Sequence, residues 1–302
     1  MNRLFKILIF IGILWILSYG ISYLIIDDTS ITSSDQIAVI PIQGMITLDG
    51  GSSLLSSTTS GSNIVEKIES ANENDNVKAI ILEINSPGGT VMGSKVVADA
   101  IKNTNKPVVA YISEYGTSGA YWIASQADLI ISDELSIVGS ISVVGSYLEF
   151  SGLLEDYNIT YQRLVTGQYK DIGNPYKELT SEEEAQIQER LDSIHKFFIA
   201  EVAEGRSMSS EEIEKLSDGL FYLGLDAVNN GLVDEIGSKD YAINRTKALA
   251  NLTNADLEEY TEESSFFDSL KEFTASASFF MGQGLGTTLF TSESSGDFQI
   301  SL

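Results

Sequence analysis

The stretch from Lys78 to Ser125 reads KAIILEINSPGGTVMGSKVVADAIKNTNKPVVAYISEYGTSGAYWIAS, and it contains two apolar segments that each lead into a glycine-rich turn. The segments KAIILEI (78–84) and PVVAYI (107–112) are short apolar runs, which are typical of strands buried on both faces. Between them, the apolar residues of segment 91–101 recur with helical spacing. Strand, helix and strand in this order form a βαβ unit, so the sequence predicts a parallel sheet whose turns gather at one edge.

The same alternation extends on both sides of this stretch. Further strands are expected at 37–42, 129–131 and 141–144, and a helix is expected around 64–68. The chain is therefore predicted to be an α/β protein with a mostly parallel sheet. A long helix begins at Thr180, where T-x-x-E is a capping box. Its expected buried face carries Ile187, Leu191, Ile194, Phe198 and Val202.

The amino-terminal run ILIFIGILWILSYGISYLII (7–26) has no charged residue. Twenty helical residues span about 30 Å, the thickness of the hydrocarbon core of a bilayer. A cleavable signal peptide is the alternative, but its apolar region is usually shorter and ends at an A-x-A site, which does not follow here. Arg3 and Lys6 precede the run, and such positive flanks stay in the cytoplasm. We therefore expect one transmembrane helix in the cell membrane, with a cytoplasmic amino terminus and the rest of the chain outside.

The chain divides by composition into four parts. Residues 1–28 contain the anchor, and the polar residues 29–36 form a stalk. Residues 37–255 carry the alternating pattern of one domain. Residues 256–302 are rich in Ser, Gly and Thr, and we expect a flexible or partly helical tail there.

Composition excludes several classes of function. Acidic residues number 43 against 18 basic residues, which gives a net charge of −25. A surface this negative repels phosphate backbones, so nucleic acid is not expected as a partner. The chain has no cysteine, which excludes disulfides, thiolate metal sites and cysteine nucleophiles. The single histidine, His195, excludes sites that need two imidazoles.

The first glycine-rich turn, Asn85-Ser-Pro-Gly-Gly, follows a predicted strand at the edge where α/β proteins bind ligands. The amide of Gly88 or Gly89 could face a developing oxyanion, because glycine has no Cβ to obstruct the approach. The alternative is a tight turn that needs glycine for positive φ. Pro-Gly-Gly taken alone favours that alternative.

The second turn, Gly116-Thr-Ser-Gly-Ala, joins a predicted strand to a predicted helix. The hydroxyl of Ser118 would face the same sheet edge, and the amide of Gly119 could be a second oxyanion donor aided by the helix dipole. The alternative is that Ser118 caps the helix, as serine commonly does. The tetrapeptide taken alone favours the cap.

A nucleophilic serine needs a base, and this chain offers few. His195 lies among the apolar positions of the long helix, where we expect a structural or surface role. A lysine can replace histidine where burial lowers the pKa of its amine. Lys170, in Thr166-Gly-Gln-Tyr-Lys-Asp, lies in a glycine-containing loop flanked by an aromatic residue. Most lysines are solvated surface charges, and spacing alone does not select Lys170.

Together these motifs resemble the signal peptide peptidase A (SppA) family, membrane-anchored serine proteases of the ClpP/crotonase fold. The resemblance implies a fold of repeated ββα and βαβ units, and it covers roughly residues 36–240. Besides the anchor, it rests on Asn85-Ser-Pro-Gly-Gly, Gly116-Thr-Ser-Gly-Ala-Tyr, Val138-Gly-Ser-Ile and Thr166-Gly-Gln-Tyr-Lys-Asp-Ile, in this order.

The resemblance implies a Ser–Lys dyad in which Ser118 is the nucleophile and Lys170 is the general base. Ser140 matches the serine that positions the lysine amine. No metal or organic cofactor is implied, and the expected assembly is a ring-shaped homo-oligomer whose active sites often combine residues of neighbouring subunits. The residues that match the family's oxyanion donors are Gly88 or Gly89, together with Gly119.

The implied function is an endopeptidase that degrades signal peptides left in the membrane and other small apolar peptides. A related Ser–Lys protease that cleaves one membrane protein, as the stomatin-cleaving relatives do, shares the dyad and is not separated by sequence. A different class of alternative is a crotonase-like acyl-CoA enzyme, or an inactive scaffold on the same fold. The net charge of −25 and the expected outside location argue against a CoA site.

Overall fold

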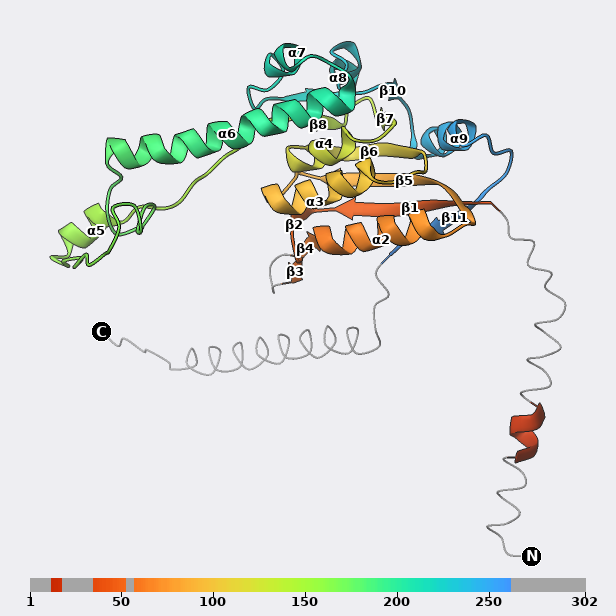
Figure 1. Cartoon of the computed structure of the whole chain (residues 1–302), viewed down its shortest axis with the longest axis horizontal. Helices are drawn as coiled ribbons and strands as arrows, with labels where there is room; N and C mark the ends of the chain where they lie inside the picture. The colour runs from red at the N-terminus through yellow and green to blue at the C-terminus, as the bar shows by residue number, and fades with distance from the viewer. Residues whose placement is uncertain (1–11, 18–34, 53–56, 262–302) are drawn as a thin grey trace, which may run out of the picture. The chain divides into compact units, whose positions relative to one another are not determined.

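The computed structural model describes residues 12–17, 35–52 and 57–261 (Figure 1). Residues 12–17 are helical and belong to the predicted anchor. The rest of the anchor, most of the stalk, and the tail from residue 262 onward lie outside the described residues. Among the described residues, no helix is long and apolar enough to cross a bilayer.

The main sheet has a parallel path of strands in the order β10-β7-β6-β5-β1-β11. Every pair along this path is parallel, which confirms the prediction of an α/β fold with a mostly parallel sheet. β11 continues the sheet four residues past residue 255, the predicted end of the domain. The strands of the path are β1 (Gln36–Gln43), β5 (Val77–Ser86), β6 (Val108–Thr117), β7 (Leu129–Ser132), β10 (Glu235–Ile236) and β11 (Asp256–Glu259).

One predicted strand is wrong. Residues 141–144 have no regular structure, and the strand in this region is β8 (Ile137–Gly139). β8 pairs with the end of β6 and, antiparallel, with β9 (Phe221–Leu223). It ends after Gly139, because the next residue, Ser140, adopts the left-handed conformation with φ 50° instead of an extended one. A small second sheet comprises β2 (Met45–Thr47), β3 (Gly51–Ser52) and β4 (Ser57–Ser60).

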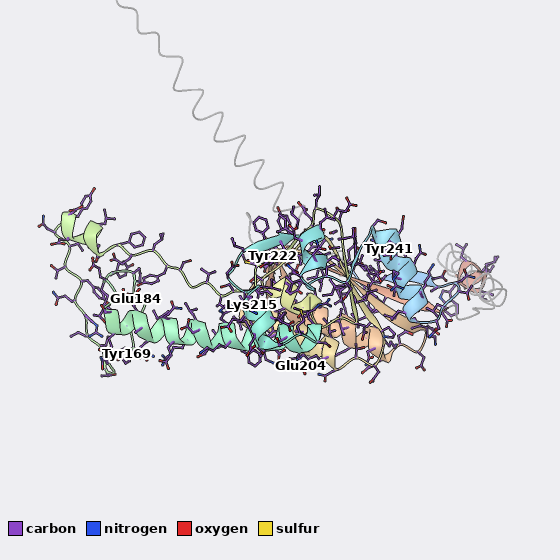
Figure 2. The ribbon with its side chains drawn as sticks, turned by 90° about the horizontal axis from the view of Figure 1, so that it is seen from above. Tyr169, Glu184, Glu204, Lys215, Tyr222 and Tyr241 are labelled. Carbon is purple, nitrogen blue, oxygen red and sulfur yellow. The ribbon has the colours of Figure 1, made fainter. Side chains whose placement is uncertain are left out.

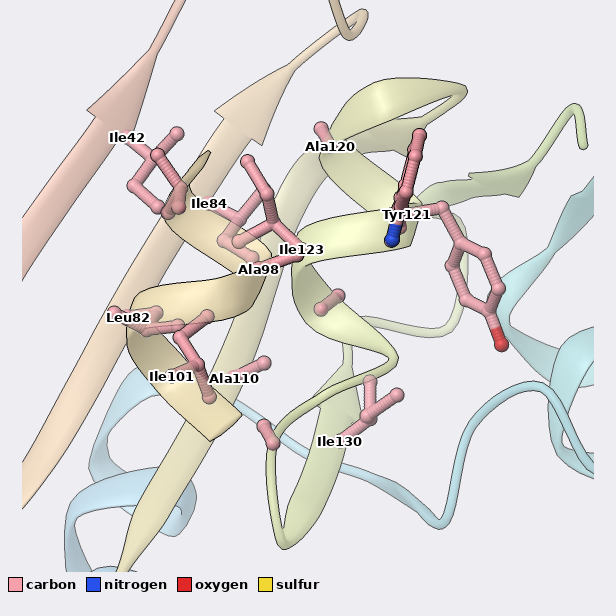
Figure 3. Packing of buried hydrophobic residues seen from close by; sticks show 14 of the residues in the cluster. Ile42, Leu82, Ile84, Ala98, Ile101, Ala110, Ala120, Tyr121, Ile123 and Ile130 are labelled. Atoms are coloured by element: carbon pink, nitrogen blue, oxygen red, sulfur yellow. The ribbon is translucent and has the colours of Figure 1, made fainter. Parts of the chain in front are cut away.

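Helices cover both faces of the main sheet, because its strands are apolar on both sides. In β1, Ile40 and Ile42 belong to the core that includes α2, α3 and α4, whereas Val39 belongs to a second core with Ala242 of α9. Neighbouring residues thus point to opposite faces, as the strand period of two requires. Figure 3 shows the first core from close by. The described helices include α2 (Gly61–Glu73), α3 (Val91–Lys102), α4 (Gly119–Ala124), α5 (Ser151–Asp156), α6 (Ser181–Arg206), α7 (Ser210–Glu214), α8 (Gly224–Asn229) and α9 (Lys239–Leu249).

The long helix α6 begins after Thr180 with the predicted capping box, formed with Glu183. Its second half packs on the body through Phe198 and Val202, which are buried. Its first half does not, so the predicted continuous buried face is wrong: Ile187, Leu191 and Ile194 are only half-buried. This first half extends away from the sheet and carries residues 145–180 at its end (Figure 1). We name residues 145–180 the arm.

Candidate active site

Ser118 lies at the junction of β6 and α4, the position expected for the nucleophile. Its backbone has φ 53° and ψ −126°, a strained conformation for a residue other than glycine. Within the described chain its side chain makes no capping hydrogen bond, so the helix-cap alternative does not hold. A strained turn from strand to helix exposes a serine hydroxyl at the sheet edge, as in known nucleophile turns.

The glycine amides around Ser118 differ in their hydrogen bonding. A Cβ at Gly88 would lie 2.8 Å from the amide nitrogen of Gly119 and 2.9 Å from Cβ of Ser118, so the two glycine-rich turns touch. The amide of Gly88 itself donates to Oγ of Ser86 over 3.1 Å. The amides of Gly89 and Gly119 donate to no acceptor in the described part of the chain, and Gly119 is the first residue of α4, where an amide has no intrahelical partner. The geometry therefore favours Gly89 over Gly88 as the first oxyanion donor.

A cavity of about 460 Å³ lies beside Ser118. Its walls are mostly apolar, and Trp122 stacks on Phe198 with ring centroids 5.1 Å apart. An apolar side chain next to a scissile bond fits such a cavity. The sequence did not identify these wall residues, because they come from separate helices and one irregular segment; they include Val91, Trp122, Val143, Val144, Ile194 and Phe198.

Ser140 follows β8 in the left-handed conformation, with φ 50°. Its amide donates to the carbonyl of Leu220 over 3.0 Å, and its hydroxyl donates to the carbonyl of Gly219, also over 3.0 Å. The hydroxyl hydrogen is thereby engaged, which leaves the lone pairs of Oγ able to accept a hydrogen bond from an amine. This geometry suits a residue that positions a lysine.

Lys170 lies in the arm, and it does not line the cavity that contains Ser118. The neighbouring residue Tyr169 donates a hydrogen bond to Glu182, at the start of α6. Ile194, which lines the cavity, follows Glu182 by twelve residues, or about 18 Å along a helix. Figure 2 shows Tyr169 beside Glu184 at the projecting end of α6, far from Tyr222 on the body. The structure therefore does not bring Lys170 to Ser118 of the same chain.

His195 lies half-buried on α6, and its Nε2 is 3.2 Å from the carbonyl oxygen of Ile141. It ties α6 to the irregular segment that follows Ser140, which is a structural role. The described residues contain no group of three or more His, Asp or Glu side chains that could hold a metal ion.

Comparison with known proteins agrees with this geometry. The family model for peptidase family S49 matches residues 100–253, and the model for Clp protease matches residues 52–132. The chain is 34% identical to the Enterococcus faecium protein named "Putative signal peptide peptidase SppA", over 78% of this chain and 70% of that protein.

Two further relatives are longer proteins. Protease 4 of Haemophilus influenzae is 32% identical over 72% of this chain and 35% of its own length. Serine protease SPPA, chloroplastic, of Arabidopsis thaliana is 32% identical over 72% of this chain and 33% of its own length. The resemblance to the SppA family is confirmed: the chain belongs to peptidase family S49 and is a serine protease.

Proposed function

We propose that this protease is a membrane-anchored endopeptidase that cleaves with a Ser118–Lys170 dyad. The observation that carries the proposal is the strained Ser118, whose side chain makes no capping bond, beside the amides of Gly89 and Gly119, which donate to no acceptor among the described residues. This arrangement offers a hydroxyl for attack and donors for the oxyanion that the attack creates.

The reaction is acyl transfer through a covalent intermediate. The neutral amine of Lys170 accepts the hydroxyl proton of Ser118 while Oγ attacks the peptide carbonyl carbon. The resulting oxyanion accepts hydrogen bonds from the amides of Gly89 and Gly119. The lysine then gives its proton to the leaving amine as the C–N bond breaks. A water molecule, deprotonated by the same lysine, hydrolyses the acyl-enzyme and restores Ser118.

We propose that a second copy of the chain supplies Lys170. Because Tyr169, next to Lys170, is bonded to Glu182 at the start of α6, the arm holds Lys170 too far along this helix to reach Ser118 of its own chain. The arm also leaves several large apolar side chains exposed, among them Leu148 (72%), Tyr157 (72%) and Leu164 (94%). Exposed apolar surface of this kind marks a protein interface. Neighbouring subunits of a ring would bury it and place each arm beside the next Ser118, where Ser140 could hold the amine.

The proposed substrates are signal peptide remnants and other short apolar peptides. Two observations support this choice: the cavity beside Ser118 is apolar, and the Enterococcus faecium relative is named as a signal peptide peptidase. The uncharged run 7–26 would anchor the enzyme in the cell membrane, with the protease domain outside the cytoplasm. Such an anchor would hold the active site near substrates that remain in the bilayer.

The test is hydrolysis of an unstructured protein by the full-length chain in detergent. Ser118→Ala and Lys170→Ala should each abolish cleavage, and His195→Ala should retain it. Activity that survives Lys170→Ala but is lost with His195→Ala would overturn the dyad. Absence of hydrolysis by the unchanged, assembled protein would overturn the endopeptidase itself.

A further inference from the structure

Ser94 on α3 is a polar residue of the cavity that the mechanism leaves unused. It lines the cavity together with Ser118, and its side chain is fully buried. Its Oγ has no hydrogen-bond partner among the described residues. A hydroxyl in a helix often bonds to the carbonyl four residues earlier, but here the carbonyl of Thr90 accepts only from the Ser94 amide, over 3.0 Å.

The hydroxyl of Ser94 lies close to the amides of Gly89 and Gly119, which donate to no acceptor among the described residues. A Cβ placed on Gly119 would lie 2.0 Å from Oγ of Ser94 and 3.4 Å from the amide nitrogen of Gly89. Oγ of Ser94 therefore lies against Gly119 and within a few ångströms of Gly89. Three donors without an acceptor among the described residues, two N–H groups and one O–H group, therefore lie close together beside the cavity that contains Ser118.

We propose that Ser94 is a catalytic residue that donates the third hydrogen bond of the oxyanion hole. This inference rests on the proposed role of Ser118. Two amides and one hydroxyl suit an oxyanion, because an alkoxide oxygen has three lone pairs and each can accept a hydrogen bond. A buried donor that stays unpaired in the free enzyme and finds its acceptor in the tetrahedral intermediate stabilises the transition state more than the ground state. Ser94 would thus raise kcat with little effect on KM.

The test compares Ser94→Ala with the unchanged enzyme, as full-length chains that assemble alike. Loss of one oxyanion donor lowers kcat on the order of 100-fold, so Ser94→Ala should lower kcat by about that factor and leave KM unchanged. A peptide aldehyde forms a tetrahedral adduct with Ser118 and places an oxygen in the hole; its inhibition constant should rise by a similar factor. Ser132 offers a matched control, because its Oγ is also buried and without a partner among the described residues, but it does not line the cavity. Ser132→Ala should leave both quantities within twofold.

A double variant distinguishes the loss of the Ser94 hydroxyl as a donor from the loss of its packing. Because a methyl group on Gly119 would lie 2.0 Å from the position of the Ser94 Oγ, Ser94→Gly combined with Gly119→Ala refills part of the space without a donor. The double variant should remain as slow as Ser94→Ala. The third donor would be overturned if the double variant recovered activity, or if kcat of Ser94→Ala stayed within twofold of the unchanged enzyme. Neither result would bear on the proposed function, which Ser118→Ala tests separately. An unchanged enzyme that neither hydrolyses protein nor binds the aldehyde would overturn both.

Discussion

The amide of Ser118 donates to the carbonyl of Gly139 over 2.8 Å, so the proposed nucleophile is tied to the strand that leads into Ser140. This bond extends the pairing of β6 with β8, in which Thr117 lies opposite Gly139. One short ladder therefore fixes the turn of Ser118 relative to the serine that is proposed to position the lysine. A disturbance at Gly139 would shift both hydroxyl groups.

Gly139→Ala tests this coupling. Gly139 has φ 90°, and an added Cβ would lie 3.2 Å from Cδ2 of Tyr222. The substitution should cost about 1–3 kcal/mol of stability from backbone strain and should lower kcat by more than tenfold. Gly231→Ala is the matched control, since φ there is 84° and, among the described residues, its Cβ would meet only the flexible side chain of Met208. Urea denaturation should show a similar loss of stability in both variants. Only Gly139→Ala should also lose kcat, and equal kcat values of the two variants would contradict the coupling.

The start of α6 should respond to acid. The pKa of the Glu183 carboxyl is held below its ordinary value by three hydrogen-bond donors. The first is Nζ of Lys177, which lies 2.5 Å from the carboxylate, and the others are the amide and the hydroxyl of Thr180. A carboxyl with a lowered pKa stabilises the fold at pH values above the unfolded pKa, and this contribution is lost as pH falls through the folded value. Below about pH 4, the ordinary value for glutamate, residues 180–186 should lose amide protection first.

Hydrogen exchange between pH 5 and pH 3 measures this loss. Glu183→Gln should show the weakened protection already at pH 5, because it removes the charge that Lys177 contacts. Protection at 180–186 that does not change over this range would contradict the assigned cap. Because this helix end also contacts Tyr169, next to Lys170, activity should fall over the same pH range.

The exposed apolar residues of the arm should control assembly. Leu164 is 94% exposed, so Leu164→Asp should leave the folding of the chain unchanged. It should nevertheless weaken the proposed ring and lower hydrolysis by at least tenfold, because a buried aspartate at an interface is costly. Sedimentation velocity measures the assembly. The control is Leu249→Asp on α9, at a residue that is 41% exposed, and this variant should assemble normally. Equal assembly of both variants would argue against the arm as an interface.

Local chemistry explains why much of the site could be predicted. The βαβ pattern places both glycine-rich turns at the same sheet edge, and Gly88 and Ser118 do touch there. The choice between Gly88 and Gly89 could not be made from sequence, because it depends on the bond from the Gly88 amide to Ser86. Nor did the apolar segment 141–144 form a strand, since the positive φ of Ser140 ends the strand before it.

The positions of Lys170 and of the first half of α6 could not be derived from local pattern. The apolar spacing of α6 continues through Ile187, yet the body of the same chain covers only its second half. When the apolar face of a helix extends beyond the part that its own chain covers, the uncovered part indicates a binding partner. The sequence carried this signal, but it does not distinguish an intramolecular surface from one on another copy.

Mixing two inactive variants tests the central claim most directly. Ser118→Ala and Lys170→Ala are purified separately, dissociated, mixed and reassembled, and hydrolysis is measured against each variant alone. If a neighbouring copy supplies the lysine, mixed assemblies contain sites that join an intact Ser118 to an intact Lys170, and about a quarter of the activity should return for random mixing of independent sites. No recovery in assemblies shown to contain both variants would contradict a dyad shared between subunits.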